Sequence, residues 1–434
     1  MREGDRMTEH FSRRTLLKSA AALAGGGLLA GCAPGGSAAN LNYWHLLTGG
    51  DGTVMAGLVD AVNAANLGFR TTQTVLAWGP PYYTKLAMAS AGGRAPDVAI
   101  MHASRIAGYA PGGLLEPWDL DLLAEAGLRK EDFPARVWEK CQYDGKLYAI
   151  ALDTHPFVLY YNTDHAEKAG VTEALHSLKS PEEFTEVATK LQKVTGKHGL
   201  SYGYLGDGAQ MWRLWYTLYK QTGAEMTLVP GQKAQVDKDV AVKTLTFVQS
   251  LLNDTIASRS GDGGTATSEF LHGESGMFFG GVWELPVLKE AKLPVDAVPI
   301  PTMFGTQAAY ADSHTFVLPR QSKVSPERRK HVYTMVAELL KRSVKWAGGG
   351  HIPAYQPVAT SAEYQALKPQ SNYAGIPAYV NYDPDVWFSG AGSDFQNYFA
   401  ENVQNVFLGS GDPAAGFDGF VDRLNKLLDR PQPV

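Results

Sequence analysis

Aromatic and planar polar side chains recur where the strands predicted from this 434-residue sequence end. Carboxylates, amides and imidazoles at such positions bind hydroxyl groups, and aromatic rings pack against apolar ring faces. This combination suits a hydroxyl-rich small ligand, and a site of this kind rejects ligands that lack the matching hydroxyls. The candidate ligand-binding residues are His45, Thr48, Asp51, Trp78, His102, Asp153, His155, Trp212, Trp283, Asp312, His314, His351 and Tyr355.

Trp78 and Trp283 are the strongest aromatic candidates, because glycine and proline lie near them and predict exposed loops. A tryptophan at a strand end or within a helix often belongs to the core instead. We assign Trp215 to the buried face of an amphipathic helix for this reason. Asp97 is interpreted as a structural turn or cap residue.

Five of the candidates are histidines, at positions 45, 102, 155, 314 and 351. Imidazole is a common ligand of transition metals, so their placement at strand ends raises a metal-binding alternative. No two of them have the His-x-His or i, i+4 spacing that ligands on one strand or helix would have. We therefore expect no metal and no other cofactor, with one or two of these imidazoles contacting ligand hydroxyls.

Motifs that are typical of hydrolases and nucleotide-binding enzymes are missing from the sequence. It has no Gly-x-Ser-x-Gly elbow, no His-Glu-x-x-His and no phosphate-binding loop. A secreted glycoside hydrolase with two facing carboxylates is the remaining enzyme alternative. We predict that the chain is not an enzyme. A net charge of -5, without a basic cluster beyond the N-terminal leader, also argues against a nucleic-acid partner.

The N-terminus predicts export and lipidation. A basic start containing Arg13 and Arg14 resembles a twin-arginine signal, and a short apolar stretch follows it. Leu29-Ala30-Gly31-Cys32 matches the lipobox of bacterial lipoproteins. We expect a signal peptide over 1–31, a lipid on Cys32 that anchors the protein at the outer face of the cytoplasmic membrane or in the periplasm, and a flexible tether over 32–40. Cys141 would then have no partner for an intramolecular disulfide.

Beyond the tether, strands and helices alternate without a repeat or a long linker, which predicts an α/β fold with mostly parallel sheets and interleaved domains. Ser180 and Ser325, each followed by proline and glutamate, predict helix starts. The predicted strands cover 41–44, 69–75 and 96–101, with a glycine-rich loop at 48–52, and the predicted helices cover 53–66, 82–90, 181–195, 211–222, 240–253, 326–341 and 418–428.

Several short motifs, in order, resemble the extracellular solute-binding proteins of ABC importers, in the branch that binds sugars and oligosaccharides. One departure is Ala151, where the family's Gly-Lys-x-Tyr-x-x-Pro hairpin has proline. The segments that carry the resemblance are 83–98, 112–117, 143–150, 159–163, 273–283 and 351–354.

The resemblance implies a two-lobed fold of the periplasmic-binding-protein type, with interleaved lobes, a hinge and a central ligand cleft. The chain would cross between lobes near 147–157, 300–312 and 345–352. The N-terminal lobe would comprise 41–152 and 311–346, and the C-terminal lobe 153–310 and 347–434.

The function implied is capture of a sugar, oligosaccharide or glycoside by a monomeric receptor that docks onto ABC permease subunits. A receptor for a glycerophosphodiester or polyol, or for a metal, is the alternative. A phosphodiester demands an arginine or a helix N-terminus, and Arg105 and Arg213 are the candidate arginines.

Overall fold

The computed structural model describes residues 39–432 of the chain. The predicted signal peptide with Arg13 and Arg14, the lipidation site Cys32 and the tether up to residue 38 lie outside this part. The last two residues of the predicted tether instead begin strand β1 (Ala39–His45). No helix within residues 39–432 combines the length and the apolar character needed to cross a membrane.

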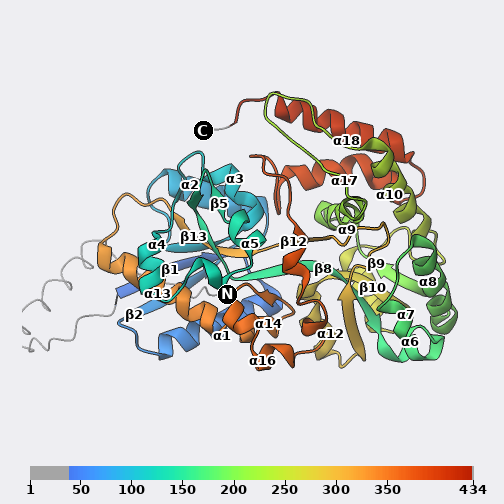
Figure 1. The fold of residues 1–434 in the computed structure, drawn as a ribbon, viewed down its shortest axis with the longest axis horizontal. Coiled ribbons are helices and arrows are strands. Elements are labelled where there is room, and N and C mark those ends of the chain that lie inside the picture. The colour runs from blue at the N-terminus through green and yellow to red at the C-terminus, as the bar shows by residue number, and fades with distance from the viewer. Residues whose placement is uncertain (1–38, 433–434) are drawn as a thin grey trace, which may run out of the picture. The chain divides into compact units, whose positions relative to one another are not determined.

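The first sheet is built around β1. Its strands follow the order β2 (Phe69–Val75), β1, β3 (Val98–His102), β13 (His314–Pro319) and β4 (Leu115–Glu116), and β7 (Ala149–Ala151) also pairs with β13. Helices α1 (Gly49–Ala64), α2 (Pro80–Ala91) and α13 (Pro326–Lys341) share one buried cluster with it. We call this assembly the first lobe (Figure 1).

The second sheet is built around β8 (Asp153–Asn162), whose ten residues are all buried. Its strands follow the order β15 (Val380–Asn381), β12 (Ala309–Asp312), β8, β10 (Ser275–Gly281) and β9 (His198–Tyr202), and β11 (Val295–Pro299) and β14 (Ile352–Pro353) also pair with β8. This sheet and the helices around it form the second lobe: α8 (Pro181–Thr195), α9 (Gly208–Gln221), α10 (Lys238–Leu251), α17 (Asp394–Phe407) and α18 (Pro413–Leu428).

The chain passes between the two sheets three times. Leu152 joins β7 to β8, Ser313 joins β12 to β13, and residues 348–351 join α14 (Val344–Ala347) to β14. β12 lies in the second sheet because Asp312 pairs with His155 of β8. The second crossing therefore follows residue 312, two residues later than the predicted boundary.

Both sheets are mixed, so the prediction of mostly parallel sheets is wrong. β13 is antiparallel to β3, β4 and β7, and β8 is antiparallel to β10, β11, β12 and β14. A parallel neighbour needs a long crossover connection, usually a helix. β8 and β13 are each entered through a single residue from the other sheet, so no such connection sets their direction.

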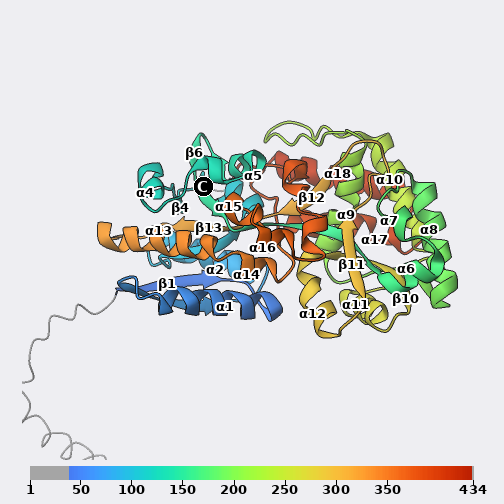
Figure 2. The ribbon, with the colours of Figure 1, turned by 60° about the horizontal axis from the view of Figure 1, so that its bottom comes forward.

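The helices predicted from capping signals lie where the sequence placed them. α8 and α13 have the predicted bounds, and the hydroxyls of Ser180 and Ser325 accept hydrogen bonds from the backbone N–H groups of Glu183 and Arg328. α1 begins at Gly49, so the predicted glycine-rich loop is the first turn of this helix. Figure 2 shows α1 lying beside α13 along the first lobe.

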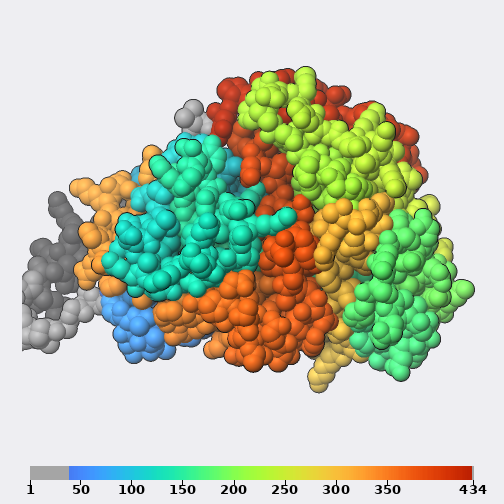
Figure 3. Space-filling view, in the orientation of Figure 1, coloured from blue at the N-terminus to red at the C-terminus, as the bar shows by residue number. Residues whose placement is uncertain are grey.

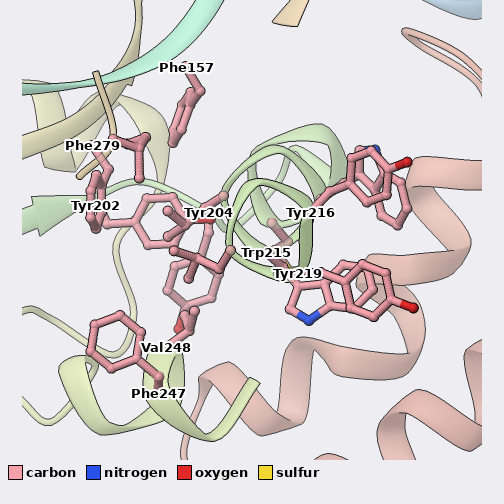
Figure 4. Close-up of a cluster of buried hydrophobic side chains, with 14 of the residues drawn as sticks. Phe157, Tyr202, Tyr204, Trp215, Tyr216, Tyr219, Phe247, Val248 and Phe279 are labelled. Atoms are coloured by element: carbon pink, nitrogen blue, oxygen red, sulfur yellow. The ribbon is translucent and has the colours of Figure 1, made fainter. Parts of the chain in front are cut away.

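Aromatic side chains fill the core of the second lobe. α9 buries both Trp212 and Trp215, and Trp215 stacks on Phe399 of α17 with ring centroids 4.7 Å apart. Figure 4 shows Trp215 with Tyr216 and Tyr219 on the same helix. The assignment of Trp215 to the core is confirmed.

The segment between α14 and β15 packs against the second sheet. Tyr364 and Tyr373 from this segment join Val158 and Tyr160 of β8 in a separate buried cluster. In Figure 3 the segment forms the orange surface between the teal first-lobe elements and the second lobe. Gly349, Gly350 and His351 of the third crossing are buried.

Candidate ligand-binding site

A cavity of about 390 Å³ lies between elements of the two lobes. Its size is within the range of about 300–1,000 Å³ that is usual for small-molecule sites. The first lobe contributes Leu46, Leu47, Thr48, Gly49, Gly50, Asp51, Trp78 and His102, and the crossings and the second lobe contribute His155, Asp207, Gln210, Arg213, Trp283 and His314.

The first turn of α1 forms one wall of the cavity. Thr48 is the N-cap residue, and the next three residues place the backbone N–H groups of the helix start beside the cavity. Asp51 in this turn accepts a hydrogen bond from His351 Nε2 over 3.0 Å. Trp78, which is 40% exposed, lies on the loop after β2 and meets the ring of His102 edge-on at 5.1 Å. This wall therefore combines an aromatic ring with helix-end donors.

Trp283 and one face of α9 form the opposite wall. The Arg213 guanidinium lies 4.7 Å from the centre of the Trp283 indole. A Cβ atom on Gly281 would come within 2.0 Å of the same indole, so only glycine fits behind it. Asp207 and Gln210 line the cavity from the start of α9. Trp283 is thus fixed by its neighbours before any ligand arrives.

Asp153 joins all three crossings behind the cavity. Its two oxygens lie 2.9 Å from His155 Nδ1 and 2.8 Å from His314 Nδ1. The carboxylate also accepts hydrogen bonds from the backbone N–H of His314 and from Trp346 Nε1 on α14. Because these partners come from different crossings, one buried carboxylate ties together the strands that connect the lobes.

Burial and neighbouring charges set the protonation states of Asp153 and of the histidines around it. Burial would raise the pKa of Asp153, but His314 and His155 outweigh it and hold that pKa well below its usual value. Burial lowers the pKa of His155 to about 3 and that of His102 well below its usual value. An ionised carboxylate only accepts hydrogen bonds, so His155 and His314 donate their Nδ1–H groups to it.

His351 differs from its neighbours. Burial lowers its pKa, but the carboxylates of Asp51 and Asp153 outweigh burial and raise it overall. Its Nε2 faces Asp51, and its Nδ1 lies 3.3 Å from Asp153. His351 therefore links the α1 wall of the cavity to the carboxylate behind it.

The structure brings seven of the thirteen predicted residues to the cavity surface: Thr48, Asp51, Trp78, His102, His155, Trp283 and His314. Asp153 and His351 lie directly behind them, each fully buried. The placement of the remaining four corrects the sequence-based assignment.

His45, Trp212, Asp312 and Tyr355 do not line the cavity. His45 is buried against Gln73, and Trp212 donates its indole N–H to Asp383 inside the second lobe. Asp312 accepts hydrogen bonds from Ser104 and Ser313. Tyr355 packs toward Phe133 in the first lobe.

Helical phase explains why Trp212 is buried while its neighbours Gln210 and Arg213 line the cavity. Residues of a helix turn by about 100° each, so Trp212 points roughly 200° away from Gln210. Asp207, Gln210 and Arg213 recur every three residues and share the cavity face. That i, i+3 spacing of polar residues was the signal in the sequence that would have identified them.

Asp97 has the structural role predicted for it. Its carboxylate is buried, accepts a hydrogen bond from the backbone N–H of Asn42 and pairs with Arg328 of α13. This pair joins β1 and the residue before β3 to α13, and neither of its residues lines the cavity.

Comparison with known proteins supports one family. Residues 57–368 match the family described as bacterial extracellular solute-binding proteins. The maltodextrin-binding protein MdxE of Bacillus subtilis is 27% identical over 222 residues, which is 49% of each chain. An arabinooligosaccharide-binding protein of the same organism is 26% identical over 54% of each chain. The chain thus spans about half the length of these relatives.

Solved structures share the fold over nearly the whole chain. The GacH receptor of Streptomyces glaucescens, solved unliganded and with acarbose, superposes with a TM-score of 0.75 at 17% identity over 90% of this chain and 99% of its own. UgpB of Mycobacterium tuberculosis, in complex with glycerophosphocholine, gives 0.75 at 18% identity over 91% and 99%. The two-lobed α/β fold predicted from the sequence is confirmed, and the chain belongs to the family of bacterial extracellular solute-binding proteins.

Proposed function

We propose that this protein is the solute receptor of an ABC importer and that it captures a sugar, oligosaccharide or glycoside in the interlobe cavity. The observation that carries the proposal is the pairing of Trp78 on one wall with Trp283 on the other, around a ring of polar side chains. Aromatic rings such as these two indoles pack on the C–H faces of a pyranose. Asp51, Asp207 and Gln210 can form hydrogen bonds with its hydroxyl groups.

The relatives favour the same class of ligand. MdxE is named for maltodextrin, and the second relative from Bacillus subtilis is named for arabinooligosaccharides. No catalytic step follows from this role, because the receptor would release an unchanged ligand to permease subunits.

The predicted export and anchoring belong to the same proposal. Arg13 and Arg14 would direct export, and a lipid on Cys32 would hold a monomeric receptor near its permease. The two lobes would close on the ligand by rotation about the three crossings. Their bounds would be those predicted from the sequence, 41–152 plus 311–346 and 153–310 plus 347–434, except that residues 311 and 312 belong to the second lobe.

Calorimetric titration tests the proposal. Residues 37–434, which contain the folded unit Ala39–Val434, are titrated with maltooligosaccharides and arabinooligosaccharides. Trp78→Ala and Trp283→Ala should each weaken binding by about 2 kcal/mol, roughly 30-fold in Kd. Trp44→Ala is the control, because Trp44 is a partly buried first-lobe tryptophan outside the cavity. Unchanged affinity in both cavity variants would exclude this site.

A glycerophosphodiester is the second candidate ligand, because two groups that bind phosphate line the cavity. Arg213 lies on one wall and the N-terminus of α1 on the other. Glycerophosphocholine in the same titration separates the two classes. Binding of the phosphodiester without any sugar, lost in Arg213→Gln, would favour this candidate over the sugar.

A further inference from the structure

Arg213 is a buried arginine without an ionic partner in the described part of the chain. It lies on α9, lines the cavity and is only 6% exposed. Its backbone carbonyl accepts a hydrogen bond from Thr217, but within residues 39–432 its guanidinium forms no ion pair and donates no hydrogen bond. A guanidinium stays charged in proteins, and a buried charge is costly unless an opposite charge or hydrogen-bond acceptors compensate it. The cavity therefore contains a positive charge that residues 39–432 leave unbalanced.

The contact with Trp283 positions the guanidinium and leaves its donors free. The carbon at the centre of the guanidinium lies over the indole, 4.7 Å from the ring centre. A cation over an aromatic ring is attracted through the ring face, and this contact does not use the five N–H donors of the guanidinium. Trp283 therefore holds Arg213 in place without satisfying its capacity for hydrogen bonds.

The two carboxylates that line the same cavity are engaged elsewhere. Asp51 accepts a hydrogen bond from Nε2 of His351. Asp207 is the N-cap residue of α9, and its carboxylate accepts a hydrogen bond from the backbone N–H of Ala209. Neither carboxylate forms an ion pair with Arg213 in the described structure. A bound molecule is therefore the remaining source of an anionic partner for this arginine.

The start of α1 adds a second feature that attracts negative charge. α1 has 16 residues, and the side chain of its N-cap residue Thr48 makes no hydrogen bond to the free N–H groups of the first turn. Thr48, Gly49 and Gly50 line the cavity. The first N–H groups of a helix lack partners within the helix and carry the positive end of its dipole, so they favour anions. Arg213 and the start of α1 thus present the same preference from opposite walls.

Arg105 provides a comparison within the same molecule. Its guanidinium also lies over an aromatic ring, 4.5 Å from the centre of Tyr83, but its Nη1 donates a hydrogen bond to the backbone carbonyl of Ser389. Arg105 does not line the cavity, and among the described residues that do, Arg213 is the only arginine or lysine. The two arginines therefore share the aromatic contact and differ in having a polar partner.

We propose that the sugar captured in this cavity carries a negatively charged group, a carboxylate or a phosphate ester, which binds Arg213 and faces the start of α1. The inference rests on the proposed function and narrows it from carbohydrates in general to acidic ones. Arginine binds carboxylate and phosphate oxygens through two parallel N–H groups. Because Trp283 lies against Arg213, a sugar that packs on this wall brings an acidic substituent within reach of the guanidinium. A neutral sugar could offer hydroxyl acceptors, but it would leave the buried charge uncompensated.

Calorimetric titration of residues 37–434 with matched neutral and acidic sugars tests the inference. The pairs are glucose with glucuronate, glucose with glucose 6-phosphate, and galactobiose with digalacturonate. The acidic member of at least one pair should bind roughly 10- to 100-fold more tightly, which is the contribution expected of hydrogen bonds between charged groups. The carboxylate and phosphate pairs distinguish the two kinds of anion.

Arg213→Gln should abolish this preference, measured as the ratio of the two affinities in the same variant, so that any general weakening of the site cancels. Arg105→Gln is the matched control and should keep the ratio, because Arg105 contacts an aromatic ring outside the cavity. Circular dichroism shows whether each variant is folded. The comparison within the unmodified protein needs no variant, so loss of folding in a variant leaves the inference open to refutation.

The inference and the proposed function fail in different ways. If neutral sugars bind and their acidic counterparts bind no more tightly, the inference is overturned and the sugar receptor stands. A preference that persists in Arg213→Gln, or that disappears equally in Arg105→Gln, also overturns the inference. Binding of glycerophosphocholine alone, lost in Arg213→Gln, supports an anion at Arg213 and overturns the sugar receptor. If neither sugars nor glycerophosphocholine bind, both are overturned.

Discussion

Asp383 is a buried carboxyl group of the second lobe whose ionisation should make the stability of the protein depend on pH. It accepts hydrogen bonds from the indole of Trp212, from the Tyr310 hydroxyl and from Gln396. Burial, and then the nearby charge of Asp312, raises its pKa to about 7. In the unfolded chain the same group titrates near pH 3.9.

The sign of the effect follows from proton binding. Between about pH 4 and 7 the folded state keeps this proton and the unfolded state has lost it, so stability falls as pH rises through this window. Below about pH 4 the contribution is fully present, and above about pH 7 it is lost. A difference of about three pKa units corresponds to about 4 kcal/mol.

Asp383→Asn should remove this dependence, because an amide stays neutral throughout. Relative to the unmodified protein, the variant should therefore gain about 4 kcal/mol between pH 4 and pH 8. For a folded unit of about 400 residues, an unfolding entropy of roughly 2.1 cal/mol/K per residue converts this gain into about 5 °C in Tm. The substitution also alters the hydrogen bonds of residue 383, but that contribution to the free energy of unfolding is the same at every pH.

Thermal unfolding at half-unit pH steps, followed by circular dichroism, measures the difference in Tm between variant and unmodified protein. Asp60→Asn is the control, because it makes the same charge change on an exposed side chain of α1, in the other lobe. Its difference in Tm should stay nearly flat with pH. A flat difference for Asp383→Asn would refute the reasoning, since Asp383 would then be ionised in the folded protein at low pH.

Three further predictions concern other parts of the molecule. Asp97→Ala should lower the free energy of unfolding by about 2–3 kcal/mol, measured by urea denaturation, because it leaves Arg328 without its buried partner. Gly350→Ala should melt several degrees lower in a thermal scan, because Gly350 has a φ of 105° and an added Cβ would meet the Val282 carbonyl oxygen at 2.0 Å; equal melting temperatures would contradict this. Arg213→Lys should lower sugar affinity by less than about tenfold, measured by calorimetry, if Arg213 mainly supports Trp283, and a complete loss would show a direct contact with the ligand.

Local features of the chain were accurate guides to local structure. Ser180 and Pro181 predicted the start of α8 correctly, because the serine hydroxyl accepts a hydrogen bond from the free N–H of Glu183 and proline has no N–H that needs an acceptor. Apolar spacing likewise placed Trp215 on a buried face. These signals act over a few residues and need no knowledge of the rest of the fold.

Binding residues were harder to identify, because composition gives the type of side chain and not its direction. Trp212 and Arg213 are neighbours in sequence, yet one is buried in the core and the other lines the cavity. Trp283 was identified through the glycines before it, one of which its indole requires. His45 and His102 both end strands of the first sheet, and only His102 lies beside a crossing to the other lobe.

The sequence by itself determined the class of fold, the positions of the main helices and the presence of aromatic and polar groups at strand ends, because these depend on periodicity and local hydrogen bonding. Only the tertiary structure decided which of those groups meet. His102, His155 and His314 are separated by 53 and 159 residues, and the pairing of β13 with β3 and the single-residue crossings place them together. Contacts between such distant segments depend on strand order and direction, which no short-range pattern encodes.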